Sequence, residues 1–251
     1  MSISRAIPTG IAALIVAVAS IAFVAPGPRA RVAVADSPPD IVLILTDDQR
    51  WDQLAAMPTV QRELVDKGMR FDQAFVVNSL CCPSRATILT GRYSHSTGVY
   101  KNQMPHGGFS AFKRGKDANT LPVWLDRAGY ETGLVGKYMN AYNDAHAFYE
   151  PPGWDVWQAL TSLDKPGRDY YHYSIAEQNG LTTYGTPGTD DEAAYMTDVL
   201  ADRAEAFIRS SPVDEPMFLA FWPWGRTSRA PHRCAIATPC PASLDPPAQP
   251  E

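Results

Sequence analysis

Short apolar runs alternate along the chain with segments whose apolar residues recur at helical spacing. Continuous apolar runs at 40–46 and 217–222 are typical of strands buried on both faces of a parallel sheet. The helical segment 121–128 stops before Gly129, and glycine is a common end of a helix. The pattern predicts strands at 40–46, 69–77, 131–135 and 217–222, and helices at 58–67, 83–90, 121–128 and 191–209.

The order of these elements predicts a single α/β domain over 36–225, built on a doubly wound, mostly parallel sheet. The segment 149–188 is rich in aromatic residues, glycine and proline, and we expect it to form an ordered but irregular insertion. In such folds, ligands bind beyond the carboxyl ends of the strands. Polar residues that directly follow the predicted strands are therefore the first candidates for a site.

The first 35 residues have the pattern of a secretory signal peptide. Arg5 provides a short positive region, an apolar run spans 11–24, and Ala33-Val34-Ala35 forms an A-x-A cleavage site. A membrane anchor is the alternative, but the run is shorter than the roughly 20 apolar residues that span a bilayer. We therefore expect a secreted, periplasmic or extracellular protein with no stable membrane span.

Composition argues against two classes of protein. The chain has a formal net charge of -5 and no block of basic residues, so a nucleic-acid partner is not expected. Four cysteines are too few for a small scaffold held together by disulfides. Cys81 and Cys82 are adjacent, so a strained vicinal disulfide is an alternative to two free thiols.

Cys81 precedes a predicted helix in a context that suits a reactive residue. Pro83 fits the first helical position and Gly91 fits the end, so Cys81 is expected just outside the helix N-terminus. There, unpaired amides and the helix dipole favour an anion or a thiolate. Arg85, one turn later, has a fork of donors that suits an anionic group. The alternative is a buried structural cysteine before an ordinary helix.

Asp47 and Asp48 directly follow the predicted strand 40–46. Adjacent carboxylates repel one another unless a cation binds both, and oxygen ligands favour calcium or magnesium over softer metals. A polar turn, in which one aspartate caps the next helix, is an equally good interpretation of the pair on its own.

Lys137 and His95 complete the candidates for contact with an anionic substrate. Lys137 follows the predicted strand 131–135, where its ammonium group could pair with an anion, although a lysine after a strand is more commonly solvated. His95 follows the helix that begins near Cys81. We expect His95 to contact substrate rather than to act in catalysis.

Two longer patterns combine several of these candidates. C-x-P-S-R-x-x-x-L-T-G-R runs from Cys81 to Arg92, and G-Y-x-T-x-x-x-G-K runs from Gly129 to Lys137. Both resemble signatures of the formylglycine-dependent sulfatases of the alkaline-phosphatase-like superfamily. The resemblance implies an alkaline-phosphatase-like sulfatase N-terminal domain, in which a separate formylglycine-generating enzyme converts Cys81, and not Cys82, to Cα-formylglycine.

The same resemblance implies roles and a mechanism. Asp47, Asp48 and the hydrated aldehyde at position 81 would bind calcium, while Arg85 and Lys137 would contact the sulfate and stabilise its charge. One hydroxyl of the hydrate would attack sulfur and displace the sugar alcohol, and the other would then expel sulfate and regenerate the aldehyde. The implied activity is hydrolysis of a sulfuric ester of an amino sugar or glycan.

Smaller features resemble one branch of the sulfatases, which acts on N-acetylglucosamine 6-sulfate and heparan chains. These features are the G-K-Y-M-N sequence at 136–140, the P-P-G-W sequence at 151–154 and the doubled cysteine. Met139 stands where many sulfatases have a histidine. Hydrolysis of a phosphate ester is an alternative within the superfamily, and the intact C-x-P-S-R pattern disfavours it.

The resemblance stops near Gly225. Family members usually continue from a strand like 217–222 into Gly-Pro-His or Ala-Pro-His, but here Arg226 and Thr227 follow Gly225. Loss of one base from a Gly-Pro-His-Val coding sequence would yield Gly-Arg-Thr-Ser, so we expect residues 226–251 to be a frameshifted, disordered tail. The domain would then be truncated at its C-terminus with an incomplete metal site. The alternative to an active enzyme is an inactive fragment that at most binds anions.

Overall fold

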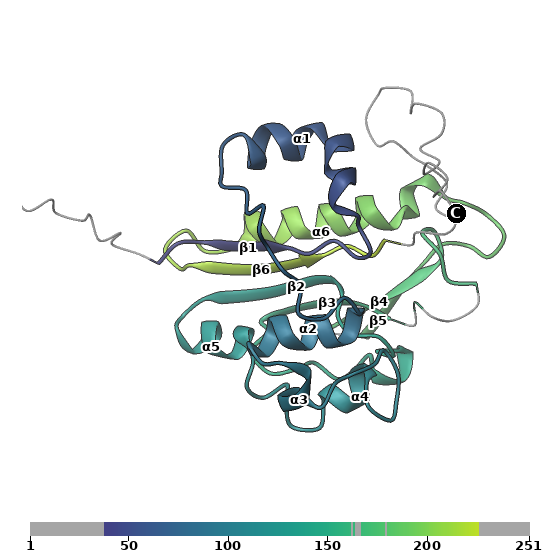
Figure 1. The fold of residues 1–251 in the computed structure, drawn as a ribbon. Coiled ribbons are helices and arrows are strands. Elements are labelled where there is room, and N and C mark those ends of the chain that lie inside the picture. The colour runs from purple at the N-terminus through teal and green to yellow at the C-terminus, as the bar shows by residue number, and fades with distance from the viewer. Residues whose placement is uncertain (1–37, 162, 164–166, 179, 226–251) are drawn as a thin grey trace, which may run out of the picture. The chain divides into compact units, whose positions relative to one another are not determined.

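A six-stranded sheet lies at the centre of the structure, a computed structural model that describes residues 38–161, 163, 167–178 and 180–225 (Figure 1). The predicted signal peptide, 1–35, and the predicted tail, 226–251, lie outside the described residues. The order of strands across the sheet is β1-β6-β2-β3-β4-β5. The strands are β1 (Ile41–Ile44), β2 (Glu131–Lys137), β3 (Val156–Thr161), β4 (Tyr173–Glu177), β5 (Gly180–Tyr184) and β6 (Met217–Trp222).

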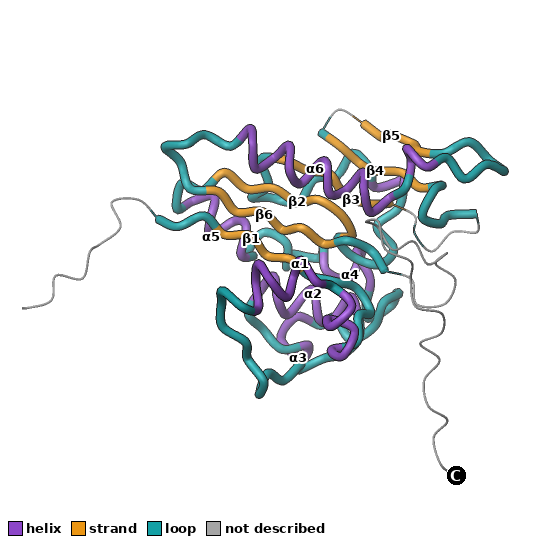
Figure 2. Tube along the Cα trace, turned by 90° about the horizontal axis from the view of Figure 1, so that it is seen from above, coloured by secondary structure: helices purple, strands orange, loops and turns teal. Residues whose placement is uncertain are grey.

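Parallel pairing joins the four strands β1, β6, β2 and β3, and antiparallel pairing adds β4 and β5. The helix α6 (Met196–Ser210) packs on β2 and β6 from one face of the sheet. The helices α2 (Cys81–Thr90) and α5 (Leu121–Arg127) lie on the opposite face (Figure 1 and Figure 2). The predicted doubly wound, mostly parallel α/β fold is therefore confirmed.

Short helices occupy the connections. The predicted helix at 58–67 is present, but only its first turn is α-helical and the next residues form a π-helical turn. The predicted helix at 191–209 begins later, after a separate 3-10 turn. The remaining bounds are α1 (Pro58–Val60), α3 (Ser94–Thr97), α4 (Gly108–Phe112), the π turn Gln61–Val65, and 3-10 turns at Trp51–Ala56, Asp144–His146 and Glu192–Ala194.

Two apolar clusters cover the two faces of the sheet. On the face of α2, Phe109 and Trp157 belong to a cluster that also contains Leu134 of β2. On the other face, Phe207 of α6 packs in a cluster with Val135, the next residue of β2. Successive residues of a strand point to opposite faces, so a strand covered by both layers is apolar at every position.

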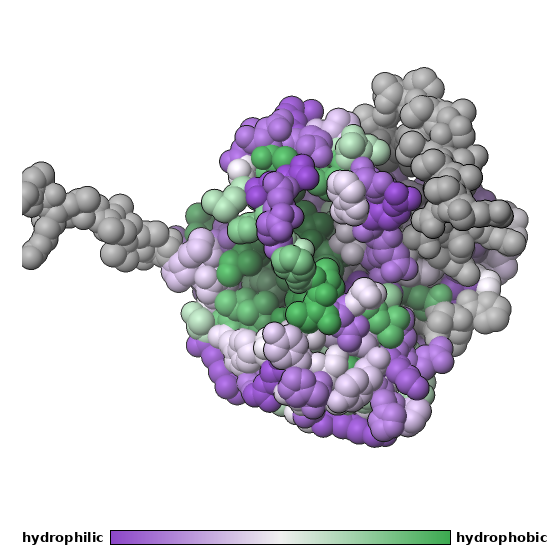
Figure 3. All heavy atoms as spheres, viewed as in Figure 1, coloured by the Kyte–Doolittle hydropathy of each residue, from purple (hydrophilic) through white to green (hydrophobic). Residues whose placement is uncertain are grey.

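The edge strand β1 differs from its prediction as a strand buried on both faces. Val42 and Ile44 are 45% and 50% exposed. Among the described strands β1 pairs only with β6, and α6 packs chiefly on β2 and β6. On the side of the molecule shown in Figure 3, apolar side chains gather at the level of β1 and of the segment 69–80, which leads to α2. Exposed large apolar residues of β1 and of the segment 69–80 are Val42, Ile44, Met69, Phe71, Phe75, Val76, Val77 and Leu80.

Two further predictions are wrong. Residues 69–77 form an exposed loop with a turn and a bend instead of a strand. Among the described residues, their backbone pairs with no strand of the sheet. The segment 149–188 is not an irregular insertion, because β3, β4 and β5 lie within it and extend the sheet beyond β2. Within the part of the chain that the structure describes, no helix is long and apolar enough to cross a bilayer.

Candidate active site

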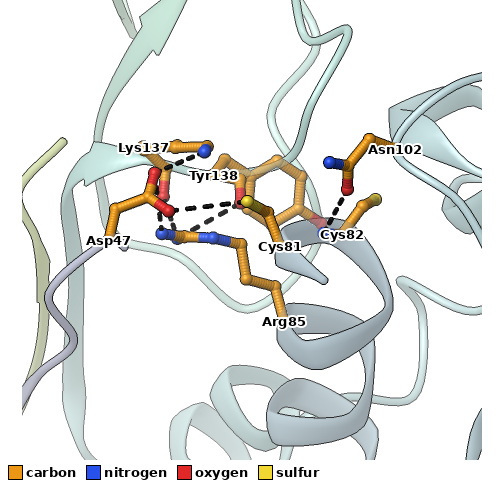
Figure 4. Close-up of polar contacts among 7 residues, drawn as sticks. All are labelled: Asp47, Cys81, Cys82, Arg85, Asn102, Lys137 and Tyr138. Carbon is orange, nitrogen blue, oxygen red and sulfur yellow. Dashed lines mark hydrogen bonds and ion pairs between the residues drawn. The ribbon is translucent and has the colours of Figure 1, made fainter. Parts of the chain in front are cut away.

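Three distant segments meet at the carboxyl edge of the parallel strands. Asp47 and Asp48 follow β1, Lys137 ends β2, and Cys81 opens α2. Because β1 and β2 run in the same direction within one sheet, their carboxyl ends bring Asp47 and Lys137 into contact across 90 positions of sequence (Figure 4). The sequence candidates Asp47, Asp48, Cys81 and Lys137 therefore share one place in the fold.

The helix α2 begins at Cys81, two residues earlier than predicted. Leu80 is the N-cap residue, and Pro83 occupies the third helical position. Proline is tolerated there because the first amides of a helix have no partner within the helix. Gly91 ends the helix with a φ of 65°, as expected. Cys81 is therefore the first helical residue rather than a residue outside the helix, and the positive end of the dipole still acts on it.

The adjacent cysteines have different surroundings, and both are free thiols in this structure. Cys81 lines a cavity, and its Sγ lies 3.5 Å from Oδ1 of Asp47. Cys82 is fully buried, and its Sγ lies 3.4 Å from Sδ of Met139. Burial raises the pKa of Cys82 to about 11. Its backbone N–H donates a 2.9 Å hydrogen bond to Oδ1 of Asn102 (Figure 4). Only Cys81 of this pair faces space that a ligand can enter.

Asp47 is a buried carboxylate beside two cations. Its Oδ2 accepts a hydrogen bond from the ammonium group of Lys137 and lies 3.8 Å from Nη2 of Arg85 (Figure 4). Removing one partner of such a pair leaves an uncompensated buried charge, which is strongly destabilising. The carboxylate therefore holds both basic side chains close to Cys81.

Arg85 lies behind the cavity wall. Its side chain is 3% exposed, and Nη1 donates a 2.6 Å hydrogen bond to the backbone carbonyl of Lys137. The guanidinium also lies over the ring of Trp222, 5.1 Å from the centroid. Burial lowers the pKa of Arg85, and Asp47 opposes that shift. One nitrogen of the fork therefore holds the end of β2, and a contact between Arg85 and an anionic substrate remains a prediction.

Asp47, Asp48 and Cys81 form a compact group of potential metal ligands. One ligand atom from each lies within 4.8 Å of the others. Asp48 has a φ of 54°, a left-handed conformation that aspartate tolerates better than most residues, and it lines the cavity. Two carboxylates fit a hard divalent cation, whereas a thiolate prefers softer metals. The group therefore suits such a cation once position 81 carries oxygen, and about three to five more oxygens complete a calcium shell.

The cavity beside Cys81 has a volume of about 560 Å³. Its polar lining includes three predicted residues and three that the sequence analysis did not single out. These six are Asp48, Cys81, Lys137, Asn102, Asn140 and Arg168. Asn140 lies in the G-K-Y-M-N sequence, which was a usable signal. Asn102 and Arg168 lie outside both motifs, so the local sequence gives no signal that they belong to the site.

His95 does not line this cavity. It lies on α3, is exposed, and stacks on Tyr93 with 5.8 Å between the ring centroids. A contact between His95 and substrate remains a prediction.

The sequence model of the sulfatase family matches residues 39–226. This chain belongs to the sulfatase family. It is 34% identical over 216 residues to human N-acetylglucosamine-6-sulfatase, and the matched region covers 83% of this chain and 37% of that protein. A putative extracellular sulfatase Sulf-1 homolog of Caenorhabditis elegans is 34% identical over 175 residues, which covers 69% of this chain and 23% of that protein. The chain thus spans well under half the length of these curated relatives.

Solved structures share the fold of this sulfatase chain. The complex of one protein with its substrate D-glucosamine-2-N,6-O-disulfate has a TM-score of 0.58 and 29% identity, and the match covers 78% of this chain and 35% of that chain. The crystal structure of Ps i-CgsB has a TM-score of 0.52 and 22% identity over 77% of this chain and 46% of that chain, which supports the fold alone.

Proposed function

We propose that this site, with Cys81 converted to Cα-formylglycine, hydrolyses a sulfate ester of an amino sugar or glycan. One observation carries the proposal. Cys81 opens onto the cavity next to Asp47 and Lys137, whereas Cys82 is enclosed in the core. A modified residue at position 81 would therefore meet both a substrate and the charged groups that its chemistry requires.

Maturation and metal binding belong to this proposal. A formylglycine-generating enzyme is the partner that oxidises Cys81, and the hydrated aldehyde supplies the hydroxyl nucleophile for sulfur. Calcium is the proposed metal, with Asp47, Asp48 and position 81 as its ligands from this chain, and it supplies positive charge near the sulfuryl oxygens. The two carboxylates of the group support a hard cation at this place.

Two basic residues of the chain have different proposed roles. Lys137 lines the cavity, so its ammonium group can bind a sulfuryl oxygen and stabilise negative charge there. Arg85 is buried and bonded to the carbonyl of Lys137. We assign it to positioning Lys137 and Asp47 and to the electrostatics of the site, rather than to a direct fork on sulfate.

Relatives support the substrate class and the location. N-acetylglucosamine-6-sulfatases and a protein bound to a glucosamine disulfate are among the proteins that this chain resembles. Other relatives are named extracellular sulfatases. We therefore propose a sulfated amino sugar or glycan as substrate and a secreted, periplasmic or extracellular location.

The proposed function is tested by co-expressing the full chain with a formylglycine-generating enzyme and checking conversion of the Cys81 peptide by mass spectrometry. The converted chain is expected to hydrolyse 4-nitrophenyl sulfate faster than 4-nitrophenyl phosphate. Chelation should remove the activity, and calcium should restore it. Cys81→Ala should abolish turnover, while the matched variant Cys82→Ala should retain most of it.

Three outcomes would contradict the proposal. They are turnover by Cys81→Ala, preference for the phosphate ester, and no turnover by a chain whose Cys81 is fully converted and supplied with calcium. The last result would favour an inactive fragment.

A further inference from the structure

Arg168 is a second basic group in the cavity, and the proposed sulfate chemistry does not use it. Lys137 ends β2, and its register partner on β3 is Leu160, which also lines the cavity. Arg168 lies farther along the chain from β3 and lines the same cavity. Lys137 and Arg168 thus reach one cavity from two chain segments. Lys137 is the last residue of β2, and Arg168 follows the carboxyl end of the neighbouring strand β3.

The guanidinium of Arg168 retains capacity to bind an anion. Its Nη2 lies 3.5 Å from Oδ2 of Asp144, longer than the roughly 2.7–2.9 Å of a charge-assisted hydrogen bond. The other oxygen of Asp144 accepts a 2.7 Å hydrogen bond from the hydroxyl of Thr161. A guanidinium has five N–H donors in a planar fork, and within the described residues one carboxylate at 3.5 Å leaves most of them available. The Arg168 side chain is 19% exposed, so solvent reaches it.

The backbone next to Arg168 is held in place by a turn. Oδ1 of Asp169 accepts hydrogen bonds from the backbone amides of Tyr171 and His172, at 2.8 and 2.9 Å. The ring of Tyr170 stacks on Trp224, a residue of the cavity wall, with 5.7 Å between centroids. These contacts fix the residues that directly follow Arg168, so less backbone entropy is lost there when a ligand binds.

We infer that Arg168 binds a second anionic substituent of the substrate, so that the preferred ligands are sugars with another sulfate or a carboxylate near the sulfate ester. This inference rests on the proposed function, because it assumes that the ester lies at Cys81. The cavity, at about 560 Å³, has the size of a small-molecule site. Its neutral residues Asn140, Ala141 and Tyr142 provide walls for the sugar itself.

The test compares sugars that differ in one charged group. N-acetylglucosamine 6-sulfate, glucosamine-2-N,6-O-disulfate and a uronate-linked N-acetylglucosamine 6-sulfate disaccharide are titrated into the full chain with calcium. Fluorescence of the tryptophans, one of which lines the cavity, reports binding. At least one doubly anionic sugar should bind about tenfold more tightly than the singly sulfated sugar, which corresponds to one charge-assisted hydrogen bond. The preferred sugar identifies the second group as sulfate or carboxylate.

Variants separate the role of Arg168 from a structural one. Arg168→Gln should abolish the preference while leaving affinity for the singly sulfated sugar nearly unchanged, and Arg168→Lys should recover part of the preference. Arg209→Gln, an equal charge change at an exposed position of α6, should keep the preference.

Equal affinity for all three sugars would overturn the inference, as would a preference that survives in Arg168→Gln or an equal loss for every sugar. Failure of all three sugars to bind would instead overturn the proposed function.

Discussion

At the residue scale, the two adjacent cysteines show how one helical step separates two chemical environments. Successive residues of a helix are rotated by about 100°, so Cys81 and Cys82 project from α2 in different directions. Cys81 lines the cavity, and Cys82 contacts Met139 in the core. A reagent that reaches the folded chain can therefore distinguish the two thiols by their surroundings.

This difference predicts selective alkylation of the folded, unconverted chain. Iodoacetamide at pH 8 should modify Cys81 much faster than Cys82, because the thiolate is the reactive form and burial raises the pKa of Cys82 to about 11. Labelling of Cys82 should stay slow as the pH rises toward 10, and should become fast only after unfolding, because the thiol is fully buried in the folded chain. Mass spectrometry of pulse-labelled peptides measures both rates, and Cys81→Ser isolates the rate of Cys82. Comparable rates at pH 8 would contradict the assignment.

At the scale of elements, the backbone conformation at the end of β2 and its packing against β6 require a glycine at position 136. Gly136 has a φ of 118°, and a Cβ added there would overlap the backbone carbonyl of Trp222 on β6. The next residue is Lys137, whose carbonyl is held by Arg85. Glycine before the lysine therefore permits the close approach of β2 and β6 that places Lys137 beside Asp47.

Gly136→Ala is expected to lower the free energy of unfolding by about 3 kcal/mol, because it combines backbone strain with overlap. Gly129→Ala is the matched control, since its φ is 86° but an added Cβ would meet nothing within 4 Å. This control should cost only about 1 kcal/mol. Urea unfolding followed by circular dichroism measures both changes, and equal costs would argue against overlap with β6.

At the scale of the whole molecule, β1 presents an apolar edge. Val42 and Ile44 are about half exposed on a strand that has one described neighbour in the sheet. Edge strands of this kind promote pairing between chains, and charged residues at an edge oppose it. The surface beside β1 is therefore expected to govern how the isolated chain associates.

The double variant Val42→Lys with Ile44→Lys should shift the isolated chain toward monomer. Analytical ultracentrifugation over a range of concentrations measures this change. Val213→Lys adds a positive charge at a fully exposed valine in the turn before β6 and should not alter association. If wild type and the double variant sediment alike at every concentration, β1 is not an association surface.

Local patterns predicted most of the elements but not the whole sheet. The strand at 217–222 was recognised because both its faces are buried, which makes it apolar at every position. Residues 69–77 are also rich in apolar residues, but a strand requires a hydrogen-bonding partner. Among the described residues the segment has no such partner, and the local sequence does not reveal this. The strands within 149–188 were not predicted because pairing, rather than local composition, stabilises them: β3 pairs with β2, β4 pairs with β3, and β5 pairs with β4.

Residue types and short spacings are local properties, and they were sufficient to predict the chemical groups of the site and the resemblance to a family. Cys81, Asp47, Asp48 and Lys137 were predicted as site residues from these local patterns, without knowledge of their positions in the fold. Which side chains share the cavity depends on the packing of distant segments. Arg168 follows β3 and lines the cavity, whereas Arg85 on α2 is buried and bonds the carbonyl of Lys137, and both positions result from contacts between segments far apart in the chain.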